Sequence, residues 1–442
     1  MKILLKEGLA LLEKEGRLIT EKTDIYIEGN RIKAVGGCAN DFSPEAVYDC
    51  ADKLVMPGLI NSHTHAYMTL FRNYADDMAF FDWLSSVQAV EEYMTEEDCY
   101  WGTLLAALEM IKSGTTCFVD MNIKSAAKGV KKGPESACSG AARESGMRAV
   151  ITRGLSGFAQ DPDSVMKFGE VLDEFETFKD DELITMWFGP HAPYSCMADY
   201  LKKIALKAKE LGAGQTIHLS ESTAEMENMA RDNGGLTPIE YVNNLGVFEV
   251  PTIAAHCVNA TDNDIIIMKE KNVSAALNPK SNMKLGNGFA PAEKFLEAGV
   301  NVCLGTDGCG SNNCLNMFAE MNTAALVYKG ANKKAQCISA EDVLRFATVN
   351  GAKAIGREGE LGIIKEGALA DLCVLDLDKP WFYPRNSLVS SLVYSAKGSE
   401  TETVIINGEP VMEAGKVLTI NEKEVYAACE EITRRLNMNK EF

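Results

Sequence analysis

The residues most suited to chemistry in this chain of 442 residues are its five histidines. Each lies at or just beyond the end of a short apolar run that we expect to be the first, fourth, fifth or sixth strand of a series. In a barrel of parallel strands these ends share one face, and that face carries the active site. The sequence therefore predicts that one site contains all of the histidines: His63, His65, His191, His218 and His256.

Two of the histidines have the spacing of metal ligands. His63 and His65 leave the first strand on alternate residues, so both side chains project to one side. Imidazole nitrogen is a preferred ligand of zinc. His218 after the fifth strand and Asp307 after the eighth would complete a set of three histidines and one aspartate. Such a set leaves room for a water molecule, as catalytic metal sites do.

Glu221 is the candidate proton carrier. It lies three residues after His218, where the strand gives way to a loop, so its carboxylate can reach a water at the metal. The alternative is a solvated loop glutamate, because Glu225 and Glu227 follow closely. The fourth strand ends in His191 and not in a lysine that could bridge two metals, so we expect one metal ion.

The middle of the chain alternates short apolar runs with longer segments that are apolar at every third or fourth position. The runs lack strict alternation, as do strands that are buried on both faces. About eight strand–helix units over some 300 residues favour a (β/α)8 TIM barrel over a doubly wound sheet. The expected strands are Val55–Asn61, Thr115–Met121, Arg148–Leu155, Ile184–His191, Gln215–Ser220, Thr252–Val258, Val273–Asn278 and Val300–Asp307.

Both ends of the chain have the pattern of β-structure. Residues 24–35 alternate around a Gly29-Asn30 turn, and residues 403–412 turn at Asn407-Gly408. Since the two ends of a large insertion usually lie close together, both chain ends can build one domain. We therefore predict an α/β protein in which residues 1–54 and 359–442 form a small β-sandwich domain with a C-terminal helix, and residues 55–358 form the barrel.

Composition and charge restrict the partners. With 63 acidic and 44 basic residues the net charge is −19, which repels polyphosphate, so we expect neither nucleic acid nor an anionic membrane as a partner. No apolar stretch approaches the roughly 20 residues of a membrane span. The thirteen cysteines include no C-x-x-C pair, and the N-terminus lacks a signal-peptide pattern, which indicates a cytoplasmic protein. Whether it forms a homo-oligomer stays open.

Several motifs carry a resemblance to a known family. They are Met56–His65, Gly189–Cys196, Ala254–Val258, Asn278–Gly288, Leu304–Gly308 and Glu366–Asp371. Together they resemble the amidohydrolase superfamily and, within it, the 5-methylthioadenosine/S-adenosylhomocysteine deaminases. The resemblance covers nearly the whole chain.

The resemblance implies roles for the reacting groups. His63, His65, His218 and Asp307 would bind one divalent metal, with zinc expected and Fe²⁺ or Mn²⁺ as alternatives. The metal would activate a water molecule for attack on the purine ring. Glu221 would carry protons, and His256 with Asp307 would take the proton of the attacking water.

The resemblance also implies three substrate contacts. Glu91 would hold the ribose hydroxyls, His191 would lie near a ring nitrogen, and Arg153 would face the polar tail of the substrate. The alternatives are an exposed helix acid for Glu91 and a salt bridge at a strand end for Arg153. Members of the family that accept S-adenosylhomocysteine can present a second arginine after the third strand, but residues 156–163 contain none and include two aspartates. We therefore expect a small, uncharged 5′ group to be preferred.

The sequence thus predicts a metal-dependent hydrolase that removes the amino group of an adenine nucleoside as ammonia. The main alternative is the same chemistry, or a chlorohydrolase reaction, on another ring: guanine, a pterin, cytosine or an s-triazine. A non-enzymatic assembly protein on this scaffold is disfavoured, because such a protein should have lost ligands and here all of them are present.

Overall fold

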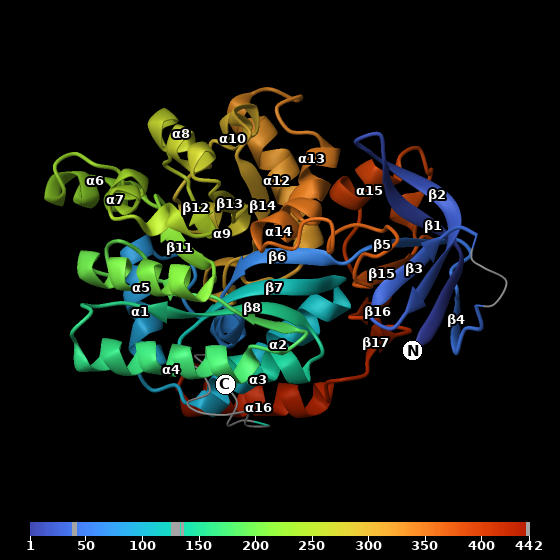
Figure 1. Cartoon of the computed structure of the whole chain (residues 1–442), viewed down its shortest axis with the longest axis horizontal. Coiled ribbons are helices and arrows are strands. Elements are labelled where there is room, and N and C mark those ends of the chain that lie inside the picture. The colour runs from blue at the N-terminus through green and yellow to red at the C-terminus, as the bar shows by residue number, and fades with distance from the viewer. Residues whose placement is uncertain (38–41, 125–132, 134–136, 439–442) are drawn as a thin grey trace.

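The computed structural model describes residues 1–37, 42–124, 133 and 137–438. Parallel strands surrounded by helices form one part of the molecule, and a sheet made from both chain ends lies at its side (Figure 1). The predicted (β/α)8 barrel is confirmed.

The barrel strands follow one another in chain order. Within the described residues, one half has the order β10-β8-β7-β6 with β9 beside β8, and the other has the order β11-β12-β13-β14. A parallel bridge between Phe188 and Gln215 joins the halves on one side, and the amide of Asp307 donates to the carbonyl of His63 (3.0 Å) on the other. The strands are β6 (Leu59–Thr64), β7 (Thr115–Asn122), β8 (Arg148–Leu155), β9 (Ile184–Met186) with β10 (Gly189–Pro190), β11 (Gln215–Leu219), β12 (Thr252–His256), β13 (Ser274–Leu277) and β14 (Asn301–Leu304).

Burial explains why these strands lack an alternating pattern. Every residue of β6 and β7 is buried, because side chains fill the barrel on one face and helices cover the other. The helices are α1 (Phe80–Glu91), α2 (Glu96–Lys112), α3 (Ala137–Glu144), α4 (Pro162–Phe178), α5 (Ala198–Leu211), α6 (Thr223–Asp232), α7 (Pro238–Asn244), α8 (Asp262–Glu270), α9 (Pro279–Lys284), α10 (Ala292–Ala298), α11 (Cys309–Asn312), α12 (Met317–Asn332), α13 (Ala340–Phe346), α14 (Val349–Ala354), α15 (Leu388–Tyr394) and α16 (Glu422–Arg435).

Local signals set the ends of these helices. Thr95 and Asp98 form a capping box at the start of α2, which satisfies free amides of its first turn. Gly212 ends α5 in the left-handed conformation (φ +64°) that glycine adopts without a Cβ clash. Among the described residues, no helix combines the length and apolar character that crossing a bilayer requires.

Both chain ends contribute to a single nine-stranded sheet with the order β18-β17-β16-β15-β5-β1-β2-β3 and with β4 beside β1. The pairing of β5 with β15 joins the two ends, and the predicted boundary after residue 54 falls inside β5. This sheet has a hydrophobic core of its own, which includes Ile3, Ile25 and Leu372. Its strands are β1 (Lys2–Lys14), β2 (Arg17–Glu28), β3 (Arg31–Val35), β4 (Ala46–Asp49), β5 (Lys53–Pro57), β15 (Leu372–Asp376), β16 (Thr401–Ile406), β17 (Glu409–Glu413) and β18 (Lys416–Val417).

The C-terminal helix α16 packs against the barrel helix α2 (Figure 1). Arg435 forms an ion pair with Asp98, and the thiol of Cys429 donates to the carbonyl of Trp101 (3.6 Å). This helix was predicted to belong to the small domain, whereas these contacts join it to the barrel helix α2.

Candidate active site

The predicted histidines converge at the C-terminal ends of the barrel strands. All of them except His63 line one pocket of about 230 Å³, together with Glu221, Asp307 and Glu91. His63 lies directly behind the pocket and is completely buried, with its ring centroid 5.1 Å from that of His65. The prediction that the five histidines share one site agrees with this geometry.

Hydrogen bonds assign the ring protons of two candidate ligands. Nδ1 of His65 lies 2.6 Å from the carbonyl oxygen of Met121, and Nδ1 of His218 lies 2.7 Å from that of His191. A carbonyl only accepts, so each Nδ1 carries its proton and each neutral ring presents a bare Nε2. These two Nε2 atoms lie 3.2 Å apart with lone pairs toward each other. A cation between them would remove the repulsion.

The remaining ligands complete the same centre. Oδ1 of Asp307 lies 3.4 Å from Nε2 of both His63 and His65, and both ring nitrogens of the buried His63 lack a hydrogen-bond partner among the described residues. Burial lowers the pKa of His63 and of His218, which keeps these rings neutral and able to bind a metal. The donor atoms of His63, His65 and His218 lie within 4.8 Å of one another, which fits one metal ion.

Two groups beside this centre can move protons. Glu221 is buried, and burial raises its pKa well above the ordinary value, which favours the protonated carboxyl. Oε2 of Glu221 lies 3.7 Å from Nε2 of His256. Burial lowers the pKa of His256 to about 4, so its ring is neutral and can accept a proton. A carboxylic acid and a neutral imidazole therefore stand side by side.

Backbone strain marks the same positions. Ser220, His256 and Asp307 have φ values of +52°, +72° and +61°, in the left-handed region that non-glycine residues rarely adopt. Such conformations cost of order 1 kcal/mol each and persist where the surrounding contacts determine them. Each of these residues ends or follows a barrel strand, and each turn directs a site group across the barrel mouth.

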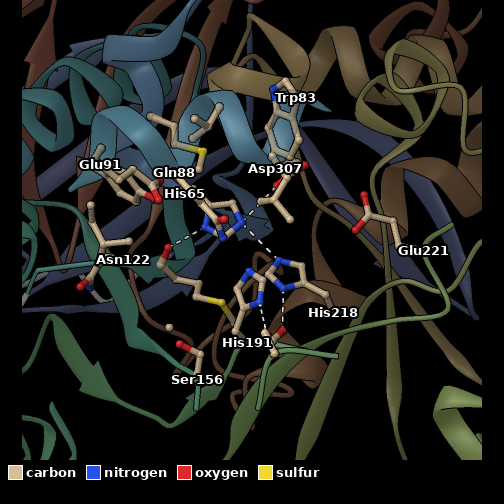
Figure 2. A pocket seen from close by; sticks show the side chains of 18 of the residues that line it. His65, Trp83, Gln88, Glu91, Asn122, Ser156, His191, His218, Glu221 and Asp307 are labelled. Carbon is tan, nitrogen blue, oxygen red and sulfur yellow. Dashed lines mark hydrogen bonds and ion pairs between the residues drawn. The ribbon is translucent and has the colours of Figure 1, made fainter. Parts of the chain in front are cut away.

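Two predicted substrate residues also line the pocket. Glu91, the last residue of α1, is half-buried, and its Oε1 accepts a hydrogen bond from the hydroxyl of Tyr67 (2.5 Å). Nδ1 of His191 lies 2.7 Å from Oγ of Ser195, and burial lowers the pKa of His191 to about 4. Figure 2 shows Glu91 and Glu221 on opposite sides of His65. A ligand that touches both must cross the metal centre.

Arg153 has a different position. Its side chain is buried and forms an ion pair with Glu170 of α4, and it is not among the residues that line the pocket. This arrangement is the salt bridge at a strand end that the sequence analysis weighed as the alternative. The substrate-facing role of Arg153 stays a prediction without support from the pocket geometry.

The pocket is also lined by residues that were not selected from the sequence, and Figure 2 shows two of them, Asn122 and Ser156, on the side away from Glu221. We call Asn122, Ser156 and Lys167 the distal wall. Lys167 lies on α4 and forms an ion pair with Asp163, four residues earlier, at 2.7 Å. The i,i+4 spacing of Asp163 and Lys167 could have revealed the pair, but only the packing of α4 turns this lysine toward the pocket.

Comparison with known proteins agrees with the motifs. Residues 54–411 match the sequence profile of the Amidohydrolase family. The chain belongs to the amidohydrolase family. The resemblance inferred from the sequence is thereby confirmed.

Two curated relatives and one solved structure are similar to this amidohydrolase over nearly its whole length. It is 44% identical over 438 residues, 98% of both chains, to the 5-methylthioadenosine/S-adenosylhomocysteine deaminase of Caldanaerobacter subterraneus subsp. tengcongensis. It is 42% identical over 417 residues, 93% of this chain and 96% of the other, to the 5'-deoxyadenosine deaminase of Methanocaldococcus jannaschii. The crystal structure of an adenosine deaminase from Xanthomonas campestris with bound zinc superposes with a TM-score of 0.92 at 29% identity and covers 99% of both chains.

Proposed function

We propose that this amidohydrolase is a metal-dependent hydrolytic deaminase of an adenine nucleoside that carries a small 5′ modification. The observation that carries the proposal is the position of Glu221 beside His256 and the metal ligands, with burial favouring the protonated form of Glu221 and with Glu91 across the same pocket. The names of the relatives support an adenosine analogue as the substrate.

His63, His65, His218 and Asp307 would hold the metal, because their bare nitrogens and carboxylate oxygen converge. A bound divalent ion, zinc by analogy with the Xanthomonas campestris relative, supplies Lewis-acid activation of water at neutral pH. Two hydroxyls orient the carboxylate of Asp307, because Ser281 and Ser311 donate to its Oδ2 at 2.7 and 2.6 Å. Its Oδ1 is thereby left to face the histidines.

Side chains of this protein then move the protons. Water attacks the ring carbon that carries the amino group, and His256 with Asp307 accepts the proton that the water loses. Glu221 donates its proton to the adjacent ring nitrogen, which interrupts the aromatic system. A further proton delivered through Glu221 lets the amino group leave as ammonia. Adenine becomes hypoxanthine, and the balance is one water consumed for one ammonia released.

Glu91 supports a nucleoside over a free base. Its carboxylate lies in the pocket on the side of His65 away from Glu221, where a ribose attached to the bound ring would extend (Figure 2). A carboxylate that accepts bonds from two hydroxyls suits a ribose and has no counterpart in guanine, cytosine or an s-triazine. These rings remain the alternatives, and their deamination would contradict the proposal.

The remaining proposals concern surroundings and partners. We propose that the protein is a cytoplasmic enzyme that does not bind nucleic acid. The net charge of −19 opposes binding to polyphosphate. All twelve described cysteines have free thiols, as expected in a reducing compartment, while Cys38 lies outside the described residues.

Ammonia release tests the proposed function. Purified protein with measured metal content is assayed with 5′-methylthioadenosine, 5′-deoxyadenosine, adenosine, S-adenosylhomocysteine, guanine and cytosine. We expect metal-dependent release of ammonia from the adenine nucleosides and a shift of their ultraviolet spectrum to that of the hypoxanthine product. Release only from guanine or cytosine, or no release from protein that holds its metal, would refute the assignment.

A further inference from the structure

One segment after the seventh barrel strand contacts three of the groups that handle protons. It comprises α9 and the following turn, residues 279–288, and it belongs to a motif to which the sequence analysis gave no role. Oγ of Ser281 donates to Oδ2 of Asp307 (2.7 Å). Nδ1 of His256 bonds with Oδ1 of Asn282 (2.9 Å). Nδ2 of Asn287 donates to Oε1 of Glu221 (3.1 Å).

We propose that Ser281, Asn282 and Asn287 are the positioning residues of this enzyme, and that this segment aligns all three acid–base groups at once. The inference rests on the proposed deaminase function. None of the three side chains lines the pocket, so each acts through the group that it holds. Groups from three different strands, β11, β12 and β14, are thereby related to each other through one short stretch of chain.

Hydrogen bonds within the segment fix its conformation. Ser281 and Asn282 are buried, and the amide of Asn282 donates to the carbonyl of Asn278 (2.9 Å) in the first turn of α9. The amide of Asn287 donates back to the carbonyl of Asn282 (2.8 Å), which fixes the distance between the two side chains that hold His256 and Glu221. Gly286 and Gly288, at φ values of +70° and +108°, provide the turn that allows this return.

Asn282 selects the tautomer of His256. The side-chain amide of Asn278 also faces Nδ1 of His256. The backbone carbonyls of Leu277 and Gly305 lie on the other side of this amide. Oriented to satisfy them, the Asn278 amide donates to both carbonyls (3.3 and 3.1 Å) and presents its oxygen to Nδ1 at 3.3 Å. Two acceptors at Nδ1 require a proton there. Nε2 is then bare on the side of Glu221 and can take the proton of water.

Asn287 orients Glu221. By holding Oε1 it directs Oε2 toward His256, 3.7 Å away, and limits rotation of the carboxyl. Ser281 acts on the metal side, because its bond to Oδ2 of Asp307 leaves Oδ1 for the histidines. Ser311 donates to the same Oδ2 at 2.6 Å, so loss of Ser281 alone should weaken this support and not abolish it.

A double-mutant cycle tests whether Asn287 acts through Glu221. We expect Asn287→Ala to lower kcat about tenfold or more with KM within about threefold, since misplacing an acid–base group costs mainly the chemical step. In a Glu221→Gln background the same change should cost almost nothing further. An unchanged kcat in Asn287→Ala, or an equal loss in both backgrounds, would overturn the role. Met283→Ala, at an exposed position of α9, is the matched control and should match the parent enzyme.

Two replacements separate orientation from packing at Asn282. Leucine keeps the approximate shape and loses the acceptor, whereas aspartate keeps an acceptor for the Nδ1 proton. We expect Asn282→Leu to lose about tenfold or more in kcat and Asn282→Asp to keep most of it. For Ser281→Ala we expect faster loss of metal during dialysis against a chelator, with content measured by elemental analysis. Equal losses in the leucine and aspartate variants, or unchanged metal retention, would contradict the proposal.

A spectroscopic measurement keeps the inference separate from the proposed activity. Nitrogen-15 NMR of metal-loaded protein labelled at histidine reports which nitrogen of His256 carries the proton. We expect the Nδ1–H form alone in the parent protein and a detectable share of the Nε2–H form in Asn282→Leu, because only the longer bond to Asn278 then holds the Nδ1 proton. If no adenine nucleoside releases ammonia, the proposed function fails while this spectrum still decides the role of Asn282. If deamination occurs but the tautomer and kcat are unaffected in Asn282→Leu, the positioning inference alone fails.

Discussion

At the metal end of the pocket, made of the four predicted ligands with His256 and Glu221, every side chain is buried and most are bonded to residues of other strands or loops. At the distal wall Asn122, the last residue of β7, is equally buried, and Lys167 is the side chain that differs. Lys167 is half-buried, shares its charge with the exposed Asp163, and comes from a helix instead of a strand end. The same pocket therefore combines a fixed reaction centre with a wall in which Lys167 is held by a partly exposed ion pair.

The difference lies in what sets the direction of a side chain. A residue at a strand end points where the strand register directs it, and in a barrel that direction leads to a common face. A residue on a covering helix points where the packing of that helix leaves it. Substitutions at the metal end should therefore change the rate strongly, and substitutions at the distal wall should change the choice of substrate weakly.

Removal of the metal should have the largest effect. Dialysis against a chelator should abolish ammonia release, because the attacking water then loses the Lewis-acid activation that the metal supplies. Titration with zinc should restore activity at about one ion per chain, and iron or manganese should be compared. Full activity of chelated protein, or recovery only near two ions per chain, would refute a single catalytic metal.

Glu221→Gln should have the next largest effect. The amide matches the carboxyl in shape, accepts a bond from Asn287 and cannot carry a proton. We expect metal content and melting temperature close to those of the parent enzyme and a loss in kcat of roughly 10²- to 10⁴-fold. If the variant with confirmed metal kept more than about a tenth of the parent rate, Glu221 would not be the proton carrier.

The pH profile should show the same division of roles. Glu221 acts as an acid, and burial raises its pKa, so the active protonated form is present at low pH and is lost as the pH rises through the raised pKa. His256 acts as a base with a pKa of about 4, so the rate should fall as the pH drops through that value. Each limb should approach about tenfold per pH unit in kcat/KM. The pH profile of the residual activity of Glu221→Gln should lack the alkaline limb. If this variant still showed the alkaline limb, the limb would belong to another group.

The metal end was predictable, and the position of Lys167 in the pocket wall was not. The five histidines and Asp307 follow buried apolar runs, so their convergence follows from the barrel. Arg153 also lies on a barrel strand, but its guanidinium pairs with Glu170, seventeen residues later on α4, a contact that depends on how α4 packs. The roles proposed for Asn282 and Asn287 likewise depend on a turn that returns to α9, although both residues stand inside a motif that the sequence analysis had singled out.

Glu91→Gln should have a moderate effect that depends on the ribose. A hydrogen bond to a charged group contributes about 1.5–3 kcal/mol, so kcat/KM for a ribonucleoside should fall about tenfold or more. A 2′-deoxynucleoside lacks one of the hydroxyls and should lose less. Equal losses for the two substrates would show that Glu91 supports Tyr67 and the pocket wall, and that the ribose lies elsewhere.

The smallest expected effect concerns the 5′ tail and tests the distal wall. The sequence analysis expected an uncharged tail, because the loop after the third strand carries aspartates in place of an arginine. In the structure Asp161 accepts a bond from the amide of Phe158 (3.0 Å), and Asp163 holds Lys167 at 2.7 Å. Lys167 is thus a cation in the pocket wall whose charge is already shared.

We expect 5′-methylthioadenosine to remain preferred over S-adenosylhomocysteine, with Asp163 and Lys167 setting the size of the preference. A partly exposed ion pair is worth about 0.2–1 kcal/mol, which corresponds to a change of about 1.4- to 5-fold. Asp163→Asn frees the ammonium group for a tail carboxylate and should narrow the ratio of kcat/KM values by that factor, whereas Lys167→Met should widen it. Lys179→Met removes a similar pair with Glu176 just beyond the far end of α4 and is the matched control. A ratio that moves equally in all three variants, or that stays constant, would mean that the tail does not reach the distal wall and that another surface selects it.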